Sequence, residues 1–278
     1  MPELPEVETV RRGLNPILEN IRIAEARAHA PKLRVDIPKD FDKRLSGNLV
    51  TRLTRRSKYI LIECEDGLVA ILHLGMSGRI NIYSAKSEHP ARSKHDHITL
   101  LTEKGDLVVF NDARRFGLLV FSSLTEIDEH PLIKDIGPEP LGNGFNSAHL
   151  AAGLKNRKSP IKTCLLDQKL VAGLGNIYVC EALWRAGIAP TRLGNTLSAS
   201  EIEALVPIIR TILEEAISAG GSTLKDYAQV SGELGYFQHR FKAYGREGEP
   251  CAAKGCQATI KRIVQSNRST FYCPDCQV

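Results

Sequence analysis

The chain has 278 residues, which is long for one hydrophobic core and comfortable for two, so we expect two domains. Hydrophobic residues make up 42% and charged residues 25%, and these globular values exclude a disordered chain, a collagen and a coiled coil. No apolar run approaches the roughly 18 residues of a membrane span, and the start Met1–Glu6 lacks the positive charge of a signal peptide, so we expect a cytoplasmic protein.

The formal net charge is +5, and much of the excess falls near the end of the chain. From Arg240 onward there are seven Lys or Arg and three acidic residues. An evenly solvated surface is the ordinary explanation of a small excess. Its concentration in a short segment favours a polyanionic partner.

The first half predicts a helix followed by β-hairpins. Apolar residues recur at helical spacing from Val7 to Leu14, and the segment Gly13–Pro16 predicts the end of this helix. Two pairs of β-prone segments follow, each pair flanking a short turn: 59–63 with 68–74, and 98–101 with 107–110.

The second half predicts helices. The segment 131–144 is rich in Gly and Pro and is a natural linker. Apolar residues then recur at helical spacing, most clearly from Ile202 to Ile217, where Ser198 and Glu201 form a capping box and Pro207 should kink the helix.

The segment Gly173–Asn176 lacks the third glycine and the preceding strand of a Rossmann nucleotide-binding loop. Such a glycine-rich turn either opens a helix, where its N–H groups can face an anion such as a DNA phosphate, or caps the end of one. The spacing leaves both alternatives open.

The strongest motif is a pair of cysteine pairs, Cys251-x4-Cys256 and Cys273-x2-Cys276. This spacing is typical of a four-thiolate zinc site, and a segment this short needs a metal to fold. Free or disulfide-bonded cysteines are the alternative, although disulfides are rare in a reducing compartment. Three isolated cysteines are expected to be small buried hydrophobes: Cys64, Cys164 and Cys180.

Between the cysteine pairs the sequence predicts a β-hairpin. The segments 258–264 and 269–272 are β-prone, and 265–268 is a polar turn with Arg268 near its tip. No helix is predicted between the pairs, which argues against the major-groove mode of ββα fingers.

Six motifs in a fixed order, which span nearly the whole chain, resemble those of the formamidopyrimidine-DNA glycosylase family. They are Pro2–Glu8, His73–Gly78, Lys94–His97, Arg114–Gly117, Gly175–Tyr178 and the four cysteines. The resemblance implies a bifunctional repair enzyme that excises oxidised purines, 8-oxoguanine and formamidopyrimidines, and then cuts the strand by β,δ-elimination.

The fold that the resemblance implies is a multidomain α+β architecture. An N-terminal β-sandwich with flanking helices would occupy 1–133 and a linker 134–145. A helix-two-turn-helix domain would occupy 146–239, and a β-hairpin zinc finger 240–278.

The resemblance also implies catalytic roles. Pro2, exposed by removal of Met1, would be the nucleophile, and Glu3 the acid that assists base departure, with Glu6 supporting the pocket. Lys58 would donate a proton during β-elimination, and Arg268 would serve δ-elimination by positioning phosphate and lesion, since a guanidinium scarcely deprotonates. On sequence alone, Pro2 would merely permit methionine removal, Glu3 and Glu6 would be helix N-terminal acids, and Lys58 a phosphate-binding cation.

The target base must leave the stack, and Met76, Arg114 and Phe116 match the wedge that fills the gap. Without the resemblance, Met76 and Phe116 would be read as core residues. The segment Gly220–Phe237 resembles the family's lesion-sensing loop. The DNA-contact positions implied by the family are His95, Arg114, Arg157, Lys162 and Asn176.

Three positions depart from the family's pattern. The first cysteine pair has four intervening residues where two are common, which puts the geometry of the finger in question. Ala113 replaces a common proline, and Arg157 stands where lysine is frequent.

Two alternatives stay open. One is an endonuclease VIII-like glycosylase that prefers oxidised pyrimidines, against which Leu4, Met76 and Phe116 argue. The other is a non-catalytic zinc-finger DNA-binding protein. For the favoured repair enzyme we expect one structural zinc ion, a partner of double-stranded DNA with a damaged base, no membrane, and a monomer in the bacterial cytoplasm that acts at the nucleoid.

Overall fold

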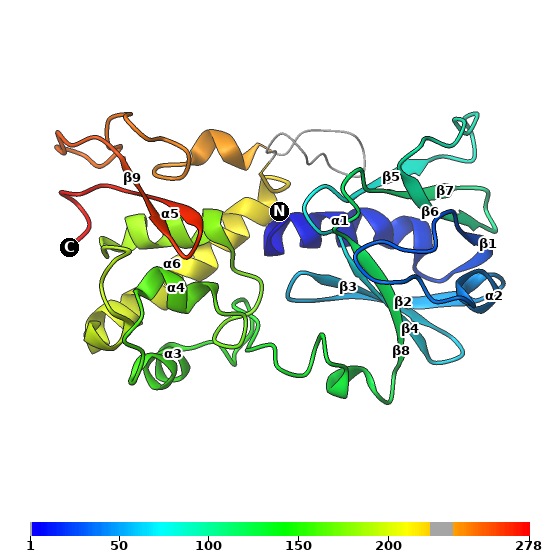
Figure 1. Ribbon diagram of the computed structural model, residues 1–278, viewed down its shortest axis with the longest axis horizontal. Helices are drawn as coiled ribbons and strands as arrows, with labels where there is room; N and C mark the ends of the chain where they lie inside the picture. Colours follow the sequence, from blue (N-terminus) through cyan, green and yellow to red (C-terminus); the bar gives the residue numbers. More distant parts are fainter. Residues whose placement is uncertain (1, 223–235) are drawn as a thin grey trace. The chain divides into compact units, whose positions relative to one another are not determined.

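The computed structural model describes residues 2–222 and 236–278 and divides the chain into two compact units (Figure 1). The first unit comprises Met1–Lys134 with Ala219–Tyr236, and the second Asp135–Ser218 with Phe237–Val278. The expected domain bounds 1–133, 146–239 and 240–278 stay predictions, and the compact units place Ala219–Tyr236 with the first unit. The expected lesion-sensing loop lies, over residues 223–235, outside the described residues.

The first unit is an eight-stranded antiparallel sheet with one long helix. The sheet order is β5-β7-β6-β1-β2-β3-β4-β8. Its elements are α1 (Leu4–Leu18), β1 (Ile21–Ala28), α2 (Phe41–Leu45), β2 (Leu49–Arg56), β3 (Tyr59–Cys64), β4 (Leu68–His73), β5 (Arg79–Tyr83), β6 (Asp96–Thr102), β7 (Leu107–Asn111), β8 (Leu118–Ser123) and the short 3-10 helix η1 (Ile127–Glu129). The predicted hairpins β3–β4 and β6–β7 are confirmed.

The sheet folds over one core because β1 serves both halves. Ile21 and Arg22 pair with β2, a bulge follows between Ile23 and Glu25, and the rest of β1 pairs with β6. A bulge bends a strand, so the half-sheets can face each other. Buried side chains from both halves, such as Ile62 and Phe110, belong to one hydrophobic cluster with α1.

Helix α1 is longer than predicted, because it continues through Pro16 to Leu18. The expected end at Gly13–Pro16 is therefore wrong. Leu14 and Leu18 are both buried in the core, and the Glu19 N–H donates to the Asn15 carbonyl at 2.9 Å, so packing and a terminal hydrogen bond hold the last turn. Tertiary burial here outweighs the local helix-breaking preference.

The second unit is helical and ends in a hairpin. Its elements are α3 (Ser147–Leu154), α4 (Ile161–Leu166), α5 (Asn176–Ala186), η2 (Gly194–Thr196), α6 (Ala199–Ser218), η3 (Phe237–Arg240), β9 (Lys261–Gln265) and β10 (Arg268–Tyr272). The long amphipathic helix is confirmed as α6, which runs through Pro207. Gly175 is the N-cap of α5, so the glycine-rich turn opens a helix.

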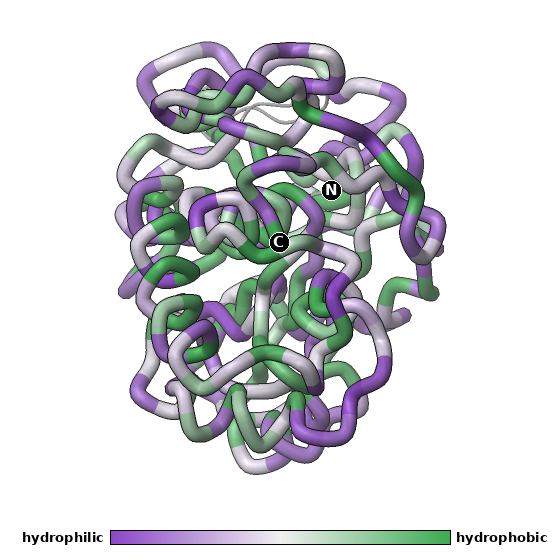
Figure 2. The backbone as a smooth tube through the Cα atoms, turned by 90° about the vertical axis from the view of Figure 1, so that its left-hand side faces the viewer, coloured by the Kyte–Doolittle hydropathy of each residue, from purple (hydrophilic) through white to green (hydrophobic). Residues whose placement is uncertain are grey.

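The predicted finger hairpin is confirmed as β9 and β10. Ser266 and Asn267 form the two-residue turn, and both adopt positive φ, as a tight hairpin turn of this length requires. Among the described residues no helix is long and apolar enough to cross a membrane. Figure 2 shows hydrophobic and hydrophilic stretches interspersed along the coloured part of the trace.

Candidate active site and metal centre

The N-terminal turn of the first unit is buried and held by carboxylates. Pro2, Glu3 and Glu6 are all buried. The Glu3 N–H donates to Glu6 Oε2 at 2.9 Å, so the side chain of Glu6 caps the start of α1. The other oxygen, Glu6 Oε1, accepts hydrogen bonds from the Ser222 N–H at 2.8 Å and the Ser222 hydroxyl at 2.9 Å. Glu6 thus fixes the helix start and the segment that leads into residue 223.

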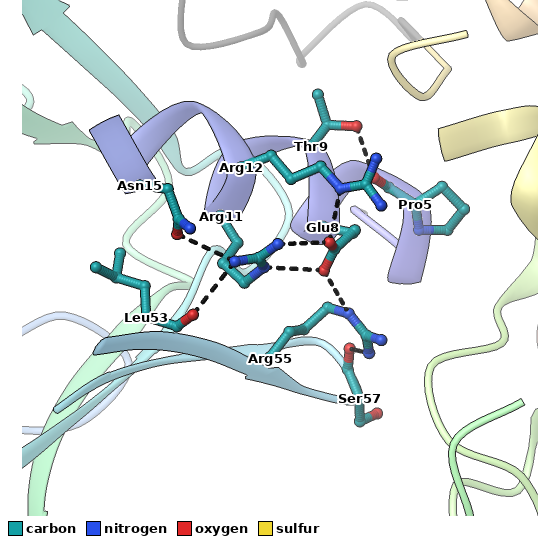
Figure 3. A network of polar contacts seen from close by, with 9 residues as sticks. All are labelled: Pro5, Glu8, Thr9, Arg11, Arg12, Asn15, Leu53, Arg55 and Ser57. Atoms are coloured by element: carbon teal, nitrogen blue, oxygen red, sulfur yellow. Dashed lines mark hydrogen bonds and ion pairs between the residues drawn. The ribbon is translucent and has the colours of Figure 1, made fainter. Parts of the chain in front are cut away.

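Figure 3 shows a polar network that joins α1 to β2. The Glu8 carboxylate accepts from Arg11 Nη2 at 2.8 Å, Arg12 Nε at 2.8 Å and Arg55 Nε at 3.2 Å. Arg11 also donates to the Leu53 carbonyl at 3.2 Å. Burial by itself would raise the pKa of Glu8, but the hydrogen bonds and charges of these arginines lower it to about 2. Glu8 is therefore a fixed anion between the helix and the strand.

Lys58 lies in the turn between β2 and β3 and is only 7% exposed. The preceding Ser57 has a φ of 55°, and its carbonyl accepts from Arg55 Nη1 at 2.8 Å. Burial and then the charge of Lys58 lower the pKa of His73 to about 4, so His73 is neutral at physiological pH. Its Nδ1 accepts from the Gly75 N–H at 2.9 Å.

The sheet register brings three loops together at one end of the strands β3, β4 and β8. Tyr59 pairs with His73, and His73 pairs with Leu118, so the residues just outside these three strand ends are neighbours. They belong to the turn with Lys58, the β4–β5 loop with Met76, and the β7–β8 loop with Phe116.

The two loops contact each other through their backbones. A Cβ on Gly75 would lie 2.3 Å from the carbonyl carbon of Phe116, so the approach requires glycine. The fully buried Asp112 joins the loops, because its Oδ1 accepts from the Ser77 hydroxyl at 2.6 Å and its Oδ2 from the Gly117 N–H at 2.7 Å.

The β4–β5 and β7–β8 loops, joined by Asp112, form a platform that exposes the predicted wedge residues to solvent. Met76 is 39% and Phe116 42% exposed, whereas large apolar side chains are usually buried. The Arg114 guanidinium lies 4.6 Å from the centre of the Phe116 ring. His95 is partly exposed, and its carbonyl accepts from the Asp112 N–H at 3.0 Å. The structure therefore brings His95 and the three wedge positions around Asp112.

The remaining expected DNA contacts lie in the second unit in differing environments. Arg157 is partly exposed and pairs with Asp167 at 2.8 Å. Asn176 begins α5 directly after the Gly175 N-cap. Arg268 is exposed beside the hairpin turn. Lys162 is fully buried, and its contact with a phosphate stays a prediction.

The four cysteines of the finger form one cluster. Their sulfurs all lie within 4.8 Å of one another. Cys251 Sγ and Cys276 Sγ are 3.9 Å apart, and Cys256 Sγ and Cys273 Sγ are 3.6 Å apart. Tetrahedral zinc with bonds of about 2.3 Å sets its sulfurs about 3.8 Å apart, so the cluster fits this ion, whereas a disulfide needs about 2.05 Å. The wider first pair does not disturb this geometry.

The protein around the sulfurs also fits a bound cation. The Ala253 N–H donates to Cys251 Sγ at 3.5 Å, and the Cys276 N–H to Cys273 Sγ at 3.4 Å. The hydrogen bond with the Cys256 sulfur and then burial raise the pKa of Cys276, and a bound cation would favour its thiolate form. The indole of Trp184 packs against this cluster. The other cysteines, Cys64, Cys164 and Cys180, are buried as predicted.

Glu8 and Asp112 are functional candidates that the sequence did not single out. Glu8 stands three and four residues before two arginines, a spacing that could have indicated ion pairs on a helix. Asp112 has only its position before the paired arginines as a signal. The bond between Glu6 and Ser222 spans 216 residues and has no local signal.

A β-sandwich that presents an apolar wedge, on one chain with helices and a four-thiolate finger, defines a zinc-finger protein that acts on nucleic acid. Three family models match: the formamidopyrimidine-DNA glycosylase N-terminal domain over 1–119, the formamidopyrimidine-DNA glycosylase H2TH domain over 136–228, and a zinc finger found in FPG and IleRS over 248–278.

Similar proteins cover the whole chain. The curated formamidopyrimidine-DNA glycosylases of Jannaschia sp. and Dinoroseobacter shibae are each 56% identical over 100% of both chains. A Lactococcus lactis Fpg solved with DNA containing an abasic site is 36% identical, with a TM-score of 0.89 over 99% of both chains. The MutM (Fpg) protein of Thermus thermophilus is 37% identical, with a TM-score of 0.86 over 99% of this chain and 98% of that one. The chain belongs to the formamidopyrimidine-DNA glycosylase family, and its four cysteines hold one structural zinc ion.

Proposed function

We propose that this DNA glycosylase of base excision repair excises 8-oxoguanine and formamidopyrimidines and then cuts the strand by β,δ-elimination. The observation that carries the proposal is the group of loops at the ends of β3, β4 and β8 in the first unit. There the turn with Lys58 and the exposed pair Met76 and Phe116 lie on neighbouring connections. An ordinary core would bury these apolar side chains, whereas a protein that extracts a base needs them at its surface.

Pro2 is the proposed nucleophile. Once Met1 is removed, its secondary amine becomes the chain terminus, and an α-amino group titrates near 8, so a useful fraction is unprotonated at neutral pH. Attack on C1′ of the sugar forms a carbon–nitrogen bond as the bond to the base breaks. The resulting iminium acidifies the C2′ protons, and loss of one of them expels the 3′ phosphate. The conjugated iminium that forms acidifies the C4′ proton, and its loss expels the 5′ phosphate.

Glu3, at the start of α1, would donate the proton that assists base departure and opening of the sugar ring. The cap from Glu6 fixes the backbone of Glu3 and thereby the turn that carries Pro2. Lys58 would supply the proton for β-elimination. It is buried in a turn beside the loops that carry the wedge residues Met76 and Phe116.

Recognition would depend on base extrusion. Met76 and Phe116 would fill the gap in the stack, and Arg114, held over the Phe116 ring, would bond the orphaned partner base, favouring cytosine. His95, Arg157 and Asn176 would contact DNA, and Arg268 would position the phosphate for δ-elimination. Zinc takes no part in a chemical step, because the four cysteines fill its coordination shell.

Borohydride trapping of a covalent adduct on a duplex with 8-oxoguanine opposite cytosine tests this proposal. We expect one trapped adduct per active chain, and none with Pro2→Gly, because glycine supplies a primary amine of altered geometry in place of the ring nitrogen. No adduct with the unaltered chain would favour a non-catalytic DNA-binding protein. An undiminished adduct with Pro2→Gly would refute the nucleophile.

A competition between lesions separates the nearest alternative. Duplexes with 8-oxoguanine and with thymine glycol are cleaved side by side, and we expect the oxidised purine to be preferred. A strong preference for thymine glycol would instead indicate an endonuclease VIII-like enzyme. We further propose that the protein acts as a monomer in the bacterial cytoplasm, at the nucleoid.

A further inference from the structure

Lys162 is a lysine of α4 with 0% of its surface exposed. Lysine is almost never fully buried unless its ammonium has partners, because removing the charge from water carries a large cost in free energy. The Nζ of Lys162 donates to Thr270 Oγ1 at 2.7 Å and to the Ser269 carbonyl at 3.3 Å. Both acceptors belong to β10, more than a hundred residues further along the chain.

The Ser269 carbonyl has a second donor. Asn176 Nδ2, at the start of α5, donates to the same oxygen at 2.8 Å. In a hairpin closed by a two-residue turn, the residues that flank the turn exchange hydrogen bonds, and here these are Gln265 and Arg268. The next pair does not, so the Ser269 carbonyl points away from β9 and requires donors from outside the hairpin.

Zinc cannot hold this end of the finger. Cys273 lies five positions after Arg268, so at a rise of about 3.3 Å per residue the hairpin tip is roughly 17 Å from the nearest cysteine along β10. The metal fixes the base of the hairpin. The bonds from Lys162 and Asn176 attach the tip, one residue from Arg268, to the helices.

We propose that Lys162 is a positioning residue that sets Arg268 at the strand-cutting step. Its buried ammonium holds the Ser269 carbonyl and the Thr270 hydroxyl of β10, directly after Arg268. The backbone from which the Arg268 side chain extends is therefore fixed in position. This inference rests on the role proposed for Arg268 in δ-elimination. Lys162 thus acts through its hydrogen bonds to Ser269 and Thr270.

The test compares Lys162→Met with Lys155→Met in the full chain with its zinc. Methionine keeps the apolar stem and removes the donors, while Lys155 is exposed at the end of α3 and controls for the loss of one charge. The readouts are the borohydride adduct on a duplex with an abasic site, the fraction of cut strands that carry a 3′-phosphate, and the zinc content. A displacement near 1 Å at a reacting group costs up to about 100-fold in rate, so we expect Lys162→Met to lower the rate of δ-elimination by about tenfold or more.

The same variant should keep its trapped adduct within about twofold, because Pro2 chemistry does not need the hairpin tip. Combining Lys162→Met with Arg268→Ala should lower δ-elimination no further than Arg268→Ala alone, as expected for two residues in one chain of action. A purely structural role for Lys162 would lower adduct and 3′-phosphate together, and an independent phosphate contact would make the two substitutions additive. Either result would overturn the proposal.

Thr270→Val decides the matter if Lys162→Met does not fold. It removes only the hydroxyl acceptor at a fully buried position and keeps the side-chain shape. We expect the same shift in products with a smaller amplitude, about threefold. An unchanged product ratio in a folded, zinc-loaded Thr270→Val protein would contradict the proposal. Absence of any adduct with the unaltered chain would instead count against the proposed function.

Discussion

At the scale of single residues, Glu8 shows how a buried carboxylate stabilises the fold near the candidate site. Its side chain is only 11% exposed and has arginine partners on its own helix and on β2. The charged form is favoured over the protonated form because three guanidinium groups surround it. The pKa of about 2 in the folded chain, against an ordinary value of 4.5, means that folding favours the ionised carboxylate.

The sign of the pH effect follows from that depressed pKa. The stabilisation is complete above pH 4.5, and it is lost as the pH falls from 4.5 toward 2, where the folded protein must take up the proton. A shift of this size corresponds to a contribution by Glu8 to the free energy of unfolding on the order of 3 kcal/mol. We expect Glu8→Gln to lower stability at pH 7 and to flatten its decline between pH 4.5 and 2, as measured by denaturant unfolding at several pH values.

Glu25→Gln is the matched control for Glu8→Gln. Glu25 forms an ion pair with Arg27 on β1, but both side chains are exposed. Exposed pairs contribute at most about 1 kcal/mol. If the two variants lost equal stability with the same pH profile, the Glu8 network would not be the source of the effect.

At the scale of elements, the two loops that carry Met76 and Phe116 act as one platform. Gly75 has a φ of 69°, and its backbone touches that of the opposite loop. Gly67, in the β3–β4 turn, has a φ of 83° and nothing within 4 Å of an added Cβ. The two glycines therefore share backbone strain and differ in crowding.

Gly75→Ala and Gly67→Ala separate these two effects. Each alanine suffers the left-handed strain of roughly 1–2 kcal/mol. Gly75→Ala adds a backbone clash, so we expect it to lose about 1–3 kcal/mol more and to reduce base excision, whereas Gly67→Ala keeps excision. Denaturant unfolding and single-turnover excision measure this, and equal losses in both variants would show that the contact between the loops is unimportant.

At the scale of the whole molecule, the zinc site and the sandwich have separate cores. The finger cluster contains Ala243, Cys251, Ile260 and Cys273, which are too few to fold a hairpin without metal. The sandwich core draws on α1 and all eight strands of the first unit and includes no residue of the finger.

Removal of zinc should therefore unfold one part and spare the other. We expect a strong chelator, or Cys273→Ser, to abolish strand cutting and the signals of the hairpin, while the first unit keeps its unfolding transition. Cys64→Ala, in the sandwich, should keep one zinc ion per chain. Metal analysis with amide hydrogen exchange measures both, and a full complement of zinc in Cys273→Ser would contradict the four-thiolate site.

Patterns that are local in the chain were predicted from sequence. The cysteine spacing indicated the metal, the polar residues Gln265–Arg268 indicated the hairpin turn, and the period from Ile202 to Ile217 indicated α6. Each depends on backbone preferences within a few residues. The end of α1 was predicted wrongly, because burial of Leu18 outweighed the local effect of Pro16.

The sequence by itself determined the zinc finger, the class of each long element and, through its ordered motifs, the family. The tertiary structure alone decided that Lys162 is buried against Ser269 and Thr270, that Glu6 binds Ser222, and that Asp112 joins the two wedge loops. The physical reason is that local pattern sets backbone conformation, whereas the choice of which distant polar groups lose water together depends on how the packed elements meet.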